Sequence, residues 1–345
     1  MSAVPQPPSD AWSTFVTHAV GFSQGAIAAC GAVTVTNPME VVKTRLQLQG
    51  EHIDLKPAAP GAAPHGQPPK VYGNAFSTFM KIARTEGFSG LQKGLSPAYG
   101  YQILLNGCRL GFYEPIRNAY QETADYFTGR TERKDNQVAV MMVAGASSGI
   151  LGAFVASPLF LIKTRMQSYA PSATAVGFQH NYVQQGTLRS LAIVFKNEGI
   201  RGLWRGVDAA MIRTGVGSAV QLSSYDINKK FLVRSGWFKT ARDNGEANVW
   251  LHFAASAVTS FYVCLAMNPF DVAMTRMYNQ KVAQDGKHGA LYKNGFDCIV
   301  KMIRTEGVSA LYKGFTAHYF RIGPHTILTF VFLEQVKAAT RMIWN

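Results

Sequence analysis

Long stretches without a charged side chain recur along this chain. Three of them contain no Asp, Glu, Lys or Arg: residues 11–39, 138–162 and 249–270. Each is long enough to cross a hydrocarbon layer of about 30 Å as a helix, which takes about 20 residues. Three further stretches are nearly as apolar, and each holds an arginine: residues 95–113, 207–225 and 315–333. The pattern predicts six candidate membrane-spanning helices.

Three copies of one sequence unit underlie this pattern. The first apolar stretch of each unit ends in a related motif: NPMEVVKTRLQ (37–47), SPLFLIKTRMQ (157–167) and NPFDVAMTRMY (268–278). A Glu-Gly motif follows in each: TEGFSGLQKG (85–94), NEGIRGLWRG (197–206) and TEGVSALYKG (305–314). A charged motif comes last: YEPIR (113–117), YDINK (225–229) and LEQVK (333–337). The glutamate of Glu-Gly precedes the later acid by 28 residues every time, so the units are true internal repeats.

Each repeat reads as an apolar helix, a proline-marked break, a polar segment with a short helix, a glycine-rich turn and a second apolar helix. Pro38, Pro158 and Pro269 are expected to kink the first helices. We place the repeats at residues 11–120, 138–232 and 249–342. Residues 1–10 are expected to be disordered, and the Pro-, Gly- and Ala-rich residues 50–69 to form a flexible insert in repeat one.

Composition alone leaves a soluble basic protein possible. The formal net charge is +14, which also suits a nucleic-acid-binding protein. Such a protein needs exposed cationic stripes, whereas here the repeats place the bases at helix ends. The four cysteines fit neither a zinc site nor a disulfide framework, and no nucleophile–base pair, metal cluster or phosphate loop is visible. The sequence therefore predicts no enzyme, no metal site and no nucleic-acid partner.

The proline, acid and base of the first motif, repeated three times with Glu-Gly between, resemble the signature of the mitochondrial carrier family. The resemblance implies an all-α membrane protein in which six transmembrane helices and short matrix helices form three repeats around a central cavity, with pseudo-three-fold symmetry. It also implies a monomeric multi-pass transporter of the mitochondrial inner membrane, with both termini toward the intermembrane space and alternating access. Finer matches such as RTGVGSAVQL (213–222) and RIGPHTIL (321–328) are similar to the branch that carries small dicarboxylates, keto acids such as oxaloacetate, and sulfate.

Arginines inside the apolar stretches point to the cargo. Arginine at mid-membrane costs a few kcal/mol or more unless it is paired or hydrated. A structural ion pair would need an acid at similar depth; the charge-free stretches have none, and the other three offer only Asp208, at the matrix end of its helix. We therefore expect Arg109, Arg213 and Arg321 to bind an anionic substrate, with cavity water and carbonyls as the alternative.

The repeats allow equivalent cavity positions to be compared. Thirteen residues before the later acids, about 20 Å along a helix, lie Tyr101, Arg213 and Arg321. The resemblance assigns Arg213 and Thr214 as a contact pair for carboxylic-acid substrates. An arginine fork holds a carboxylate or sulfate by two parallel hydrogen bonds. We expect Arg213 and Arg321 to form one clamp and Arg109 a second anion contact. The other candidates are neutral: Tyr101, Gln102, Asn106 and Gln221, of which the last three could instead bond between helices.

The acid and base of each first motif are three residues apart, so they share one helix face. Repeat one has Glu40 and Lys43, repeat two has Phe160 and Lys163, and repeat three has Asp271 and Met274. Of the two ways to pair neighbours in a ring, one strands a buried acid and a buried base at about 3–5 kcal/mol each. The other gives Glu40–Lys163, Asp271–Lys43 and an apolar Phe160–Met274 contact, and the family's pairing agrees. We expect this matrix gate, with Gln47 and Gln167 bracing its ion pairs.

A second gate is expected from the charged motifs that close the repeats. By the same analogy, its pairs on the cytosolic side are Glu114–Lys229, Asp226–Lys337 and Glu334–Arg117. Because this gate has three ion pairs and the matrix gate has two, we expect the matrix gate to open at the lower cost.

Some positions carry two interpretations at this stage. His325 could move a proton beside the cavity, or it could be a packed histidine next to Pro324. No cofactor is expected, but the residues Trp204-Arg205 and Tyr312-Lys313 resemble cardiolipin sites at helix N-termini, with simple end-capping as the alternative. Exchange, proton-coupled uptake and an uncoupling-type proton leak all remain open as modes of transport.

Overall fold

This computed structural model of the chain describes residues 11–51, 71–128, 137–234, 249–283 and 289–344. Within these residues the chain forms six long helices and three short ones. The long helices are α1 (Ala11–Leu48), α3 (Leu95–Thr128), α4 (Gln137–Ser168), α6 (Val207–Arg234), α7 (Val249–Asn279) and α9 (Phe315–Trp344). The short helices are α2 (Ala75–Leu91), α5 (Thr187–Leu203) and α8 (Gly295–Glu306), with 3₁₀ turns at Ser172–Thr174, Asn181–Gln185 and Val308–Tyr312. The expected disorder of residues 1–10 and nearly all of the expected insert at 50–69 lie outside the described residues.

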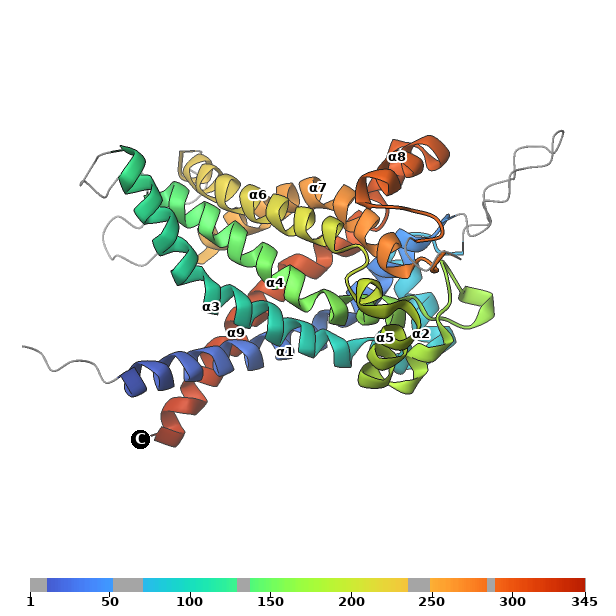
Figure 1. The fold of residues 1–345 in the computed structure, drawn as a ribbon, viewed down its shortest axis with the longest axis horizontal. Helices are drawn as coiled ribbons and strands as arrows, with labels where there is room; N and C mark the ends of the chain where they lie inside the picture. The colour runs from blue at the N-terminus through green and yellow to red at the C-terminus, as the bar shows by residue number, and fades with distance from the viewer. Residues whose placement is uncertain (1–10, 52–70, 129–136, 235–248, 284–288, 345) are drawn as a thin grey trace, which may run out of the picture.

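The six long helices form a closed ring. Each packs against two neighbours, in the order α1, α3, α4, α6, α7, α9 and back to α1. The short helices α2, α5 and α8 lie together at one end of this ring, which we call the short-helix end (Figure 1). The start of α1 and the end of α9 both lie at the opposite end. The three sequence repeats thus become three helix–helix–helix units arranged around one axis.

The first long helix of each repeat continues past its proline. Pro38, Pro158 and Pro269 lie inside α1, α4 and α7, and each helix continues for about ten residues beyond. The helices therefore do not end at these prolines, as a break would require, whereas the expected kinks stay a prediction. Proline removes one backbone hydrogen bond, but neighbouring helices compensate for it inside a bundle. The continuation matters because it carries the charged motif of each repeat into the centre of the short-helix end.

The glycine of the Glu-Gly motif turns the chain sharply, inside α2 and α5 and directly after α8. Gly87, Gly199 and Gly307 adopt φ angles of 68°, 66° and 83°, a region that suits residues without a Cβ. The glutamate directly before each glycine is held at the end of a helical segment. This turn is the local reason why Glu86, Glu198 and Glu306 recur at equivalent positions.

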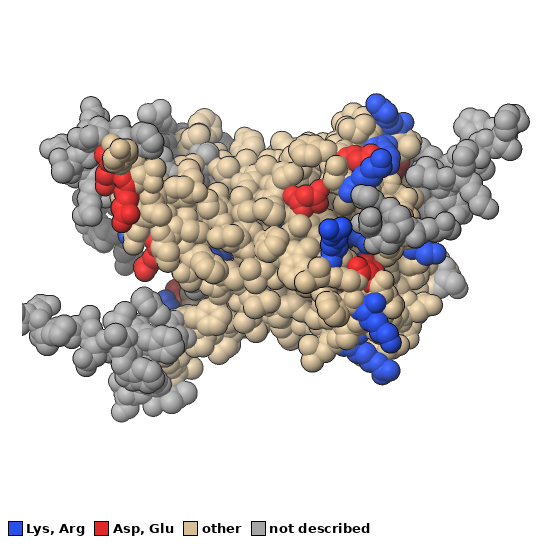
Figure 2. All heavy atoms as spheres, viewed as in Figure 1, with Lys and Arg blue, Asp and Glu red and all other residues tan. Residues whose placement is uncertain are grey.

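The face of the molecule shown in Figure 2 has few charged side chains across its middle. In the face shown in Figure 2, Lys, Arg, Asp and Glu gather toward the two ends, with most of the basic side chains over the short-helix end. Among the described residues, three helical segments are long and apolar enough to cross a membrane on composition alone: Val20–Leu48, Val140–Ser168 and Ala254–Asn279. The partner helices α3, α6 and α9 are equally long but more polar, as expected for helices that face a hydrated cavity.

Candidate functional site: a closed charge cluster beneath three arginines

Two buried ion pairs join the first helices of the repeats at the short-helix end. Lys43 Nζ on α1 lies 2.7 Å from Asp271 Oδ2 on α7, and Lys163 Nζ on α4 lies 2.7 Å from Glu40 Oε1 on α1. All four side chains are at most 7% exposed. These are the two pairs that the energetic argument favours over the alternative ring direction. In this state the first helices are therefore locked to one another at this end.

Glutamine contributes to only one of these pairs as expected. Gln47 donates from Nε2 to Asp271 Oδ2 at 2.7 Å and so braces the Lys43–Asp271 pair. Gln167 was expected to brace the other pair, but it accepts from Thr44 and donates to Asn37 instead. The difference follows from the partner helix: Asn37 offers a carbonyl oxygen to the Gln167 amide, so the glutamine ties α4 to α1 without touching the charges.

The third position of the ring is apolar. Phe160 and Met274 belong to one buried cluster with Tyr278, and the Phe160 ring packs edge-on to Tyr101 with centroids 4.9 Å apart. The Lys163 ammonium also lies 5.0 Å from the centroid of Phe160, an arrangement that attracts a cation to the ring face. The phenyl group thus fills the place of a carboxylate and still contacts the neighbouring base.

Two of the three cavity arginines contact these same acids. Arg213 Nε on α6 lies 2.5 Å from Asp271 Oδ1, and Arg321 Nη1 on α9 lies 3.8 Å from Glu40 Oε1. The expectation that no acid at similar depth would reach the arginines is therefore wrong for these two. Glu40 and Asp271 stand just past the charge-free stretches, and because the helices continue through their prolines, long arginine side chains reach them.

The remaining cavity candidates lie on the same side of the ion pairs but are less tightly held. Arg109 is exposed, and no ion pair of its side chain is seen among the described residues. Gln221 is exposed too, whereas Asn106 is half-buried. Tyr101 and Thr214 line a small pocket beside Arg213, together with Phe160, Met274 and Tyr278. The structure therefore brings Tyr101, Arg213 and Thr214 together around one pocket, and Arg109 is not among the residues that line it.

His325 is engaged through both ring nitrogens. Its Nδ1 lies 3.3 Å from Thr36 Oγ1, and its Nε2 lies 3.2 Å from Gln102 Nε2. Gln102 is one of the predicted substrate contacts, and here it bonds between helices, which is the alternative that the sequence left open. His325 thus connects α9 to both α1 and α3.

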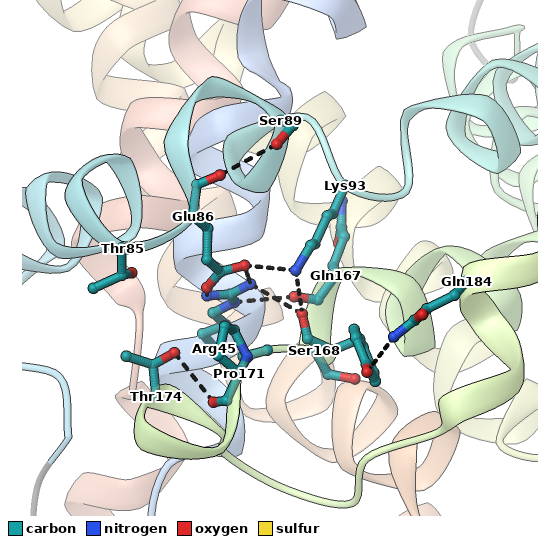
Figure 3. Close-up of polar contacts among 12 residues, drawn as sticks. Arg45, Thr85, Glu86, Ser89, Lys93, Gln167, Ser168, Pro171, Thr174 and Gln184 are labelled. Carbon is teal, nitrogen blue, oxygen red and sulfur yellow. Dashed lines mark hydrogen bonds and ion pairs between the residues drawn. The ribbon is translucent and has the colours of Figure 1, made fainter.

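Three further ion clusters, absent from our sequence-based list, surround the central pairs. In repeat one, Arg45 reaches both carboxylate oxygens of Glu86, and Lys93 Nζ lies 2.5 Å from Glu86 Oε2 (Figure 3). Arg165–Glu198–Arg205 and Arg276–Glu306–Lys313 repeat this arrangement. Burial would raise the pKa of Glu86 and Glu306, but the hydrogen bonds and charges of the bases outweigh it, so the pKa of both is lowered.

These clusters fasten each short helix to the end of a long one. The same arginines also connect neighbouring repeats. Arg45 Nε donates to the backbone carbonyl of Gln167, in the next repeat, at 3.1 Å. The signal was present in the sequence: all three repeats have an arginine seven residues after the motif proline, and a Glu-Gly further on. The sequence alone does not show that these arginines pair with these glutamates, because the two motifs are about 30 to 40 residues apart.

The bases predicted to lie near cardiolipin take part in these clusters. Arg205 Nη1 is 3.4 Å from Glu198, and Lys313 Nζ is 2.5 Å from Glu306. Trp204 donates its indole N–H to the Phe154 carbonyl at 2.9 Å. The lipid sites therefore stay a prediction, and a lipid phosphate would have to share these bases with the glutamates.

The opposite end of the ring is open. Glu114, Arg117, Glu334 and Lys337 are exposed, and Arg117 forms no ion pair with Glu334. The side chains of Asp226 and Lys229 lie outside the described residues. Of the three pairs expected for the cytosolic gate, only Glu334–Arg117 has both side chains described, and it is not formed, whereas the two pairs at the short-helix end are formed. In alternating access, each state of a transporter is closed at one end and open at the other, and this structure has that arrangement.

Comparison with known proteins agrees with this architecture. The model of the family described as "Mitochondrial carrier protein" matches three times, at residues 15–124, 134–236 and 245–342. The chain is 48% identical to the "Mitochondrial oxaloacetate transport protein" of Saccharomyces cerevisiae over 91% of this chain and 87% of that protein. It is 44% identical to the "Mitochondrial citrate transporter E" of Aspergillus niger, over 93% and 94% of the two chains. With the bovine "Mitochondrial 2-oxoglutarate/malate carrier protein" it shares 34% identity over 94% and 92%.

A ring of six helices in three repeats, closed at one end by paired charges, defines a membrane transporter. The chain belongs to the mitochondrial carrier family. It is accordingly a multi-pass protein of the mitochondrial inner membrane. In the orientation that the family implies, the short-helix end faces the matrix and the open end faces the intermembrane space.

Proposed function

We propose that this protein carries small dicarboxylates and keto acids, oxaloacetate first, across the inner membrane by alternating access. The names of its relatives, which are oxaloacetate, citrate and 2-oxoglutarate/malate carriers, support this substrate class. The residues we assign to the anion are Arg213 and Arg321, with Arg109 as the contact nearer the open end. Sulfate and malonate fit the same arginines, since both present paired oxygens to a guanidinium fork.

One observation carries the proposal. In the closed state, Arg213 and Arg321 each lie beside a carboxylate of the protein itself, Asp271 and Glu40. A dicarboxylate entering from the open end offers the same groups to the same guanidinium ions. The substrate then competes with two acids that also hold the matrix gate shut. Binding the cargo therefore weakens the attachments of Asp271 and Glu40, which ties substrate recognition to opening.

The test is uptake by the purified protein in liposomes. Labelled oxaloacetate, malonate, sulfate, malate, 2-oxoglutarate and citrate are compared, with each anion also loaded inside as the exchange partner. Loss of a hydrogen bond to a charged group costs about 1.5–3 kcal/mol, so Arg213→Ala and Arg321→Ala should each lower uptake roughly 10- to 100-fold. Arg304→Ala, an exposed arginine on α8, serves as the matched control.

The same assay contains the outcomes that oppose the proposal. Wild-type uptake that prefers 2-oxoglutarate over oxaloacetate would favour an oxoglutarate-type exchanger instead. Proton conductance without any anion uptake would point to an uncoupling-type carrier. Unchanged uptake by Arg213→Ala would remove the assigned site.

A further inference from the structure

A second histidine, His318, lies directly beneath the cavity arginines. It stands on α9 one turn before Arg321, and its side chain is fully buried. The equivalent residues of the other two repeats are Ala98 and Ala210, since each of the three donates its backbone N–H to the repeat glycine four residues earlier. An imidazole at this depth therefore occurs in one repeat alone. The substrate is not three-fold symmetric, so residues that differ between the repeats are the ones that can recognise it.

Neighbouring groups fix the tautomer of His318. Asn268 donates its amide Nδ2 to the Leu311 carbonyl at 2.8 Å, which turns its Oδ1 toward His318. That oxygen lies 3.2 Å from His318 Nδ1 and can only accept, so Nδ1 carries the proton of the neutral ring. Nε2 then holds a lone pair, and it is buried with no hydrogen-bond partner in the described part of the chain. The ring presents a ready proton acceptor.

Charged groups face this histidine from all the helices around it. Arg321 is on its own helix, and Lys43 on α1, Asp271 on α7 and Arg213 on α6 complete the surroundings. Asp271 Oδ2 is 3.9 Å from Nδ1 and is shared with Lys43. Glu40 is paired with Lys163 and lies 3.8 Å from Arg321. The three cations Lys43, Arg213 and Arg321 outnumber the one carboxylate, Asp271. While the cavity is empty, they therefore disfavour a positive charge on the His318 ring.

A dianion on the arginines reverses this balance. It adds two negative charges beside Arg213 and Arg321, and in doing so it also frees Asp271 from Arg213. Both changes favour a proton on Nε2, since opposite charges within a few ångströms stabilise the charged form of a histidine. The site thus changes from one that rejects a proton to one that accepts it, at the moment the cargo binds.

We propose that His318 is the proton-binding residue of this carrier and that one proton travels with each dianion. The proposal rests on the anion site of the proposed function. The proton enters with the substrate from the open end and binds Nε2, converting neutral imidazole to imidazolium. It leaves to the matrix when Lys43 and Asp271 separate, because His318 lies against that pair. The ring is then neutral again, and no other reactant is consumed.

His325 provides the matched control, being a second cavity histidine on the same helix. Thr36 and Gln102 occupy both of its nitrogens, so it has no vacant acceptor comparable to Nε2 of His318. The two residues therefore separate a proton carrier from a histidine that packs between helices.

The experiment uses sulfate, which remains a dianion between pH 6 and 8, so any proton that moves must be bound by the protein. Liposomes containing the full-length carrier and a trapped pH dye receive labelled sulfate, and the ratio of protons to sulfate is measured. We expect about one proton per sulfate for the wild type and for His325→Gln, with uptake that rises as the external pH falls. His318→Gln should lose the proton and the pH dependence together, whatever rate remains; His318→Asn serves if the first variant does not fold.

Three outcomes would overturn the assignment: wild-type sulfate uptake without a proton, an unchanged ratio in the His318 variants, or loss of the ratio in His325→Gln. Failure of the wild type to transport any of the dianions is different. It would remove the proposed function, and with it the basis for this inference.

Discussion

At the scale of single residues, Asp271 connects the matrix gate to the cavity arginines. Lys43 and Arg213 lie 2.7 and 2.5 Å from its two carboxylate oxygens, and Gln47 donates to it as well. Three helices thus meet at one fully buried carboxylate. Such a group stabilises the closed gate only while its partners are present, because a stranded buried charge is costly.

Asp271→Asn should therefore destabilise the closed state strongly. It removes the counter-ion of two buried cations while keeping the shape of the side chain, at a cost of about 3–5 kcal/mol. The midpoint of thermal unfolding in detergent measures this. Asp297→Asn makes the same chemical change in a partly exposed pair with Lys301 on α8, and should cost under about 1 kcal/mol. Equal shifts for both variants would contradict the role given to Asp271.

Glu51 offers a pH-dependent prediction at the short-helix end. Burial raises the pKa of its carboxyl to about 7, against the opposing charge of Arg276. A raised carboxyl pKa means that stability is full below the ordinary value of 4.5 and is lost as pH rises toward 7. Glu51→Gln should remove this loss, which amounts to about 3 kcal/mol at most.

Unfolding midpoints at pH 5 and pH 8 test this prediction. The wild type should lose stability between the two, and Glu51→Gln should be the more stable protein at pH 8. Glu306→Gln is the control of opposite sign, since the pKa of Glu306 is lowered and its contribution is already complete above the ordinary pKa. A pH dependence that survives in Glu51→Gln would assign the effect to another group.

At the scale of helices, the ring joins α1 to α4 and to α7 by ion pairs, and α4 to α7 by an apolar contact. Phe160 and Met274 occupy positions where the other repeats place charges, and both are buried. One side of the closed gate is thus held by packing with Tyr101 and Tyr278 in place of an ion pair. We expect this side to separate at the lowest electrostatic cost.

The double variant Phe160→Asp, Met274→Lys should restore a third ion pair and slow exchange by stabilising the closed gate. Each single variant should instead be destabilised, because it buries one unpaired charge at about 3–5 kcal/mol. Exchange rates in liposomes and a thermal double-mutant cycle provide the measurement. Wild-type exchange by the double variant would show that this contact does not limit opening.

At the scale of the whole molecule, the two ends of the ring are in opposite states. The short-helix end is closed by its ion pairs, whereas Arg117 and Glu334 at the other end are exposed and apart. Transport requires the reverse arrangement at another point in the cycle. The exposed charges at the open end then come together as those of the matrix gate separate.

Arg117→Cys, Glu334→Cys should report this motion. In a background where the four native cysteines are alanine, we expect a disulfide to form under mild oxidation more readily when malonate is present. The shift in mobility on a non-reducing gel, compared with each single cysteine, measures the closure. Equal cross-linking with and without malonate would contradict a substrate-driven closure of this end.

The architecture can be predicted from the amino-acid sequence. Three repeats with fixed spacing define the helices, and the cost of stranded buried charges selects which helix pairs with which around the ring. Phe160 and Met274, in different repeats, could be recognised as partners on that ground alone. These inferences hold because they depend on periodicity and on charge balance, which are properties of the chain.

The connections between the gate acids and the cavity arginines could not be predicted without the fold. Arg213 and Arg321 looked unpaired in the sequence, but they contact Asp271 and Glu40, because the helices continue through their prolines and bring distant residues to one depth. The arginine–glutamate clusters and the vacant Nε2 of His318 were likewise invisible. A long side chain can reach a partner that is far away in the sequence, and hydropathy does not identify that partner. The free energy of a buried charge depends on such partners.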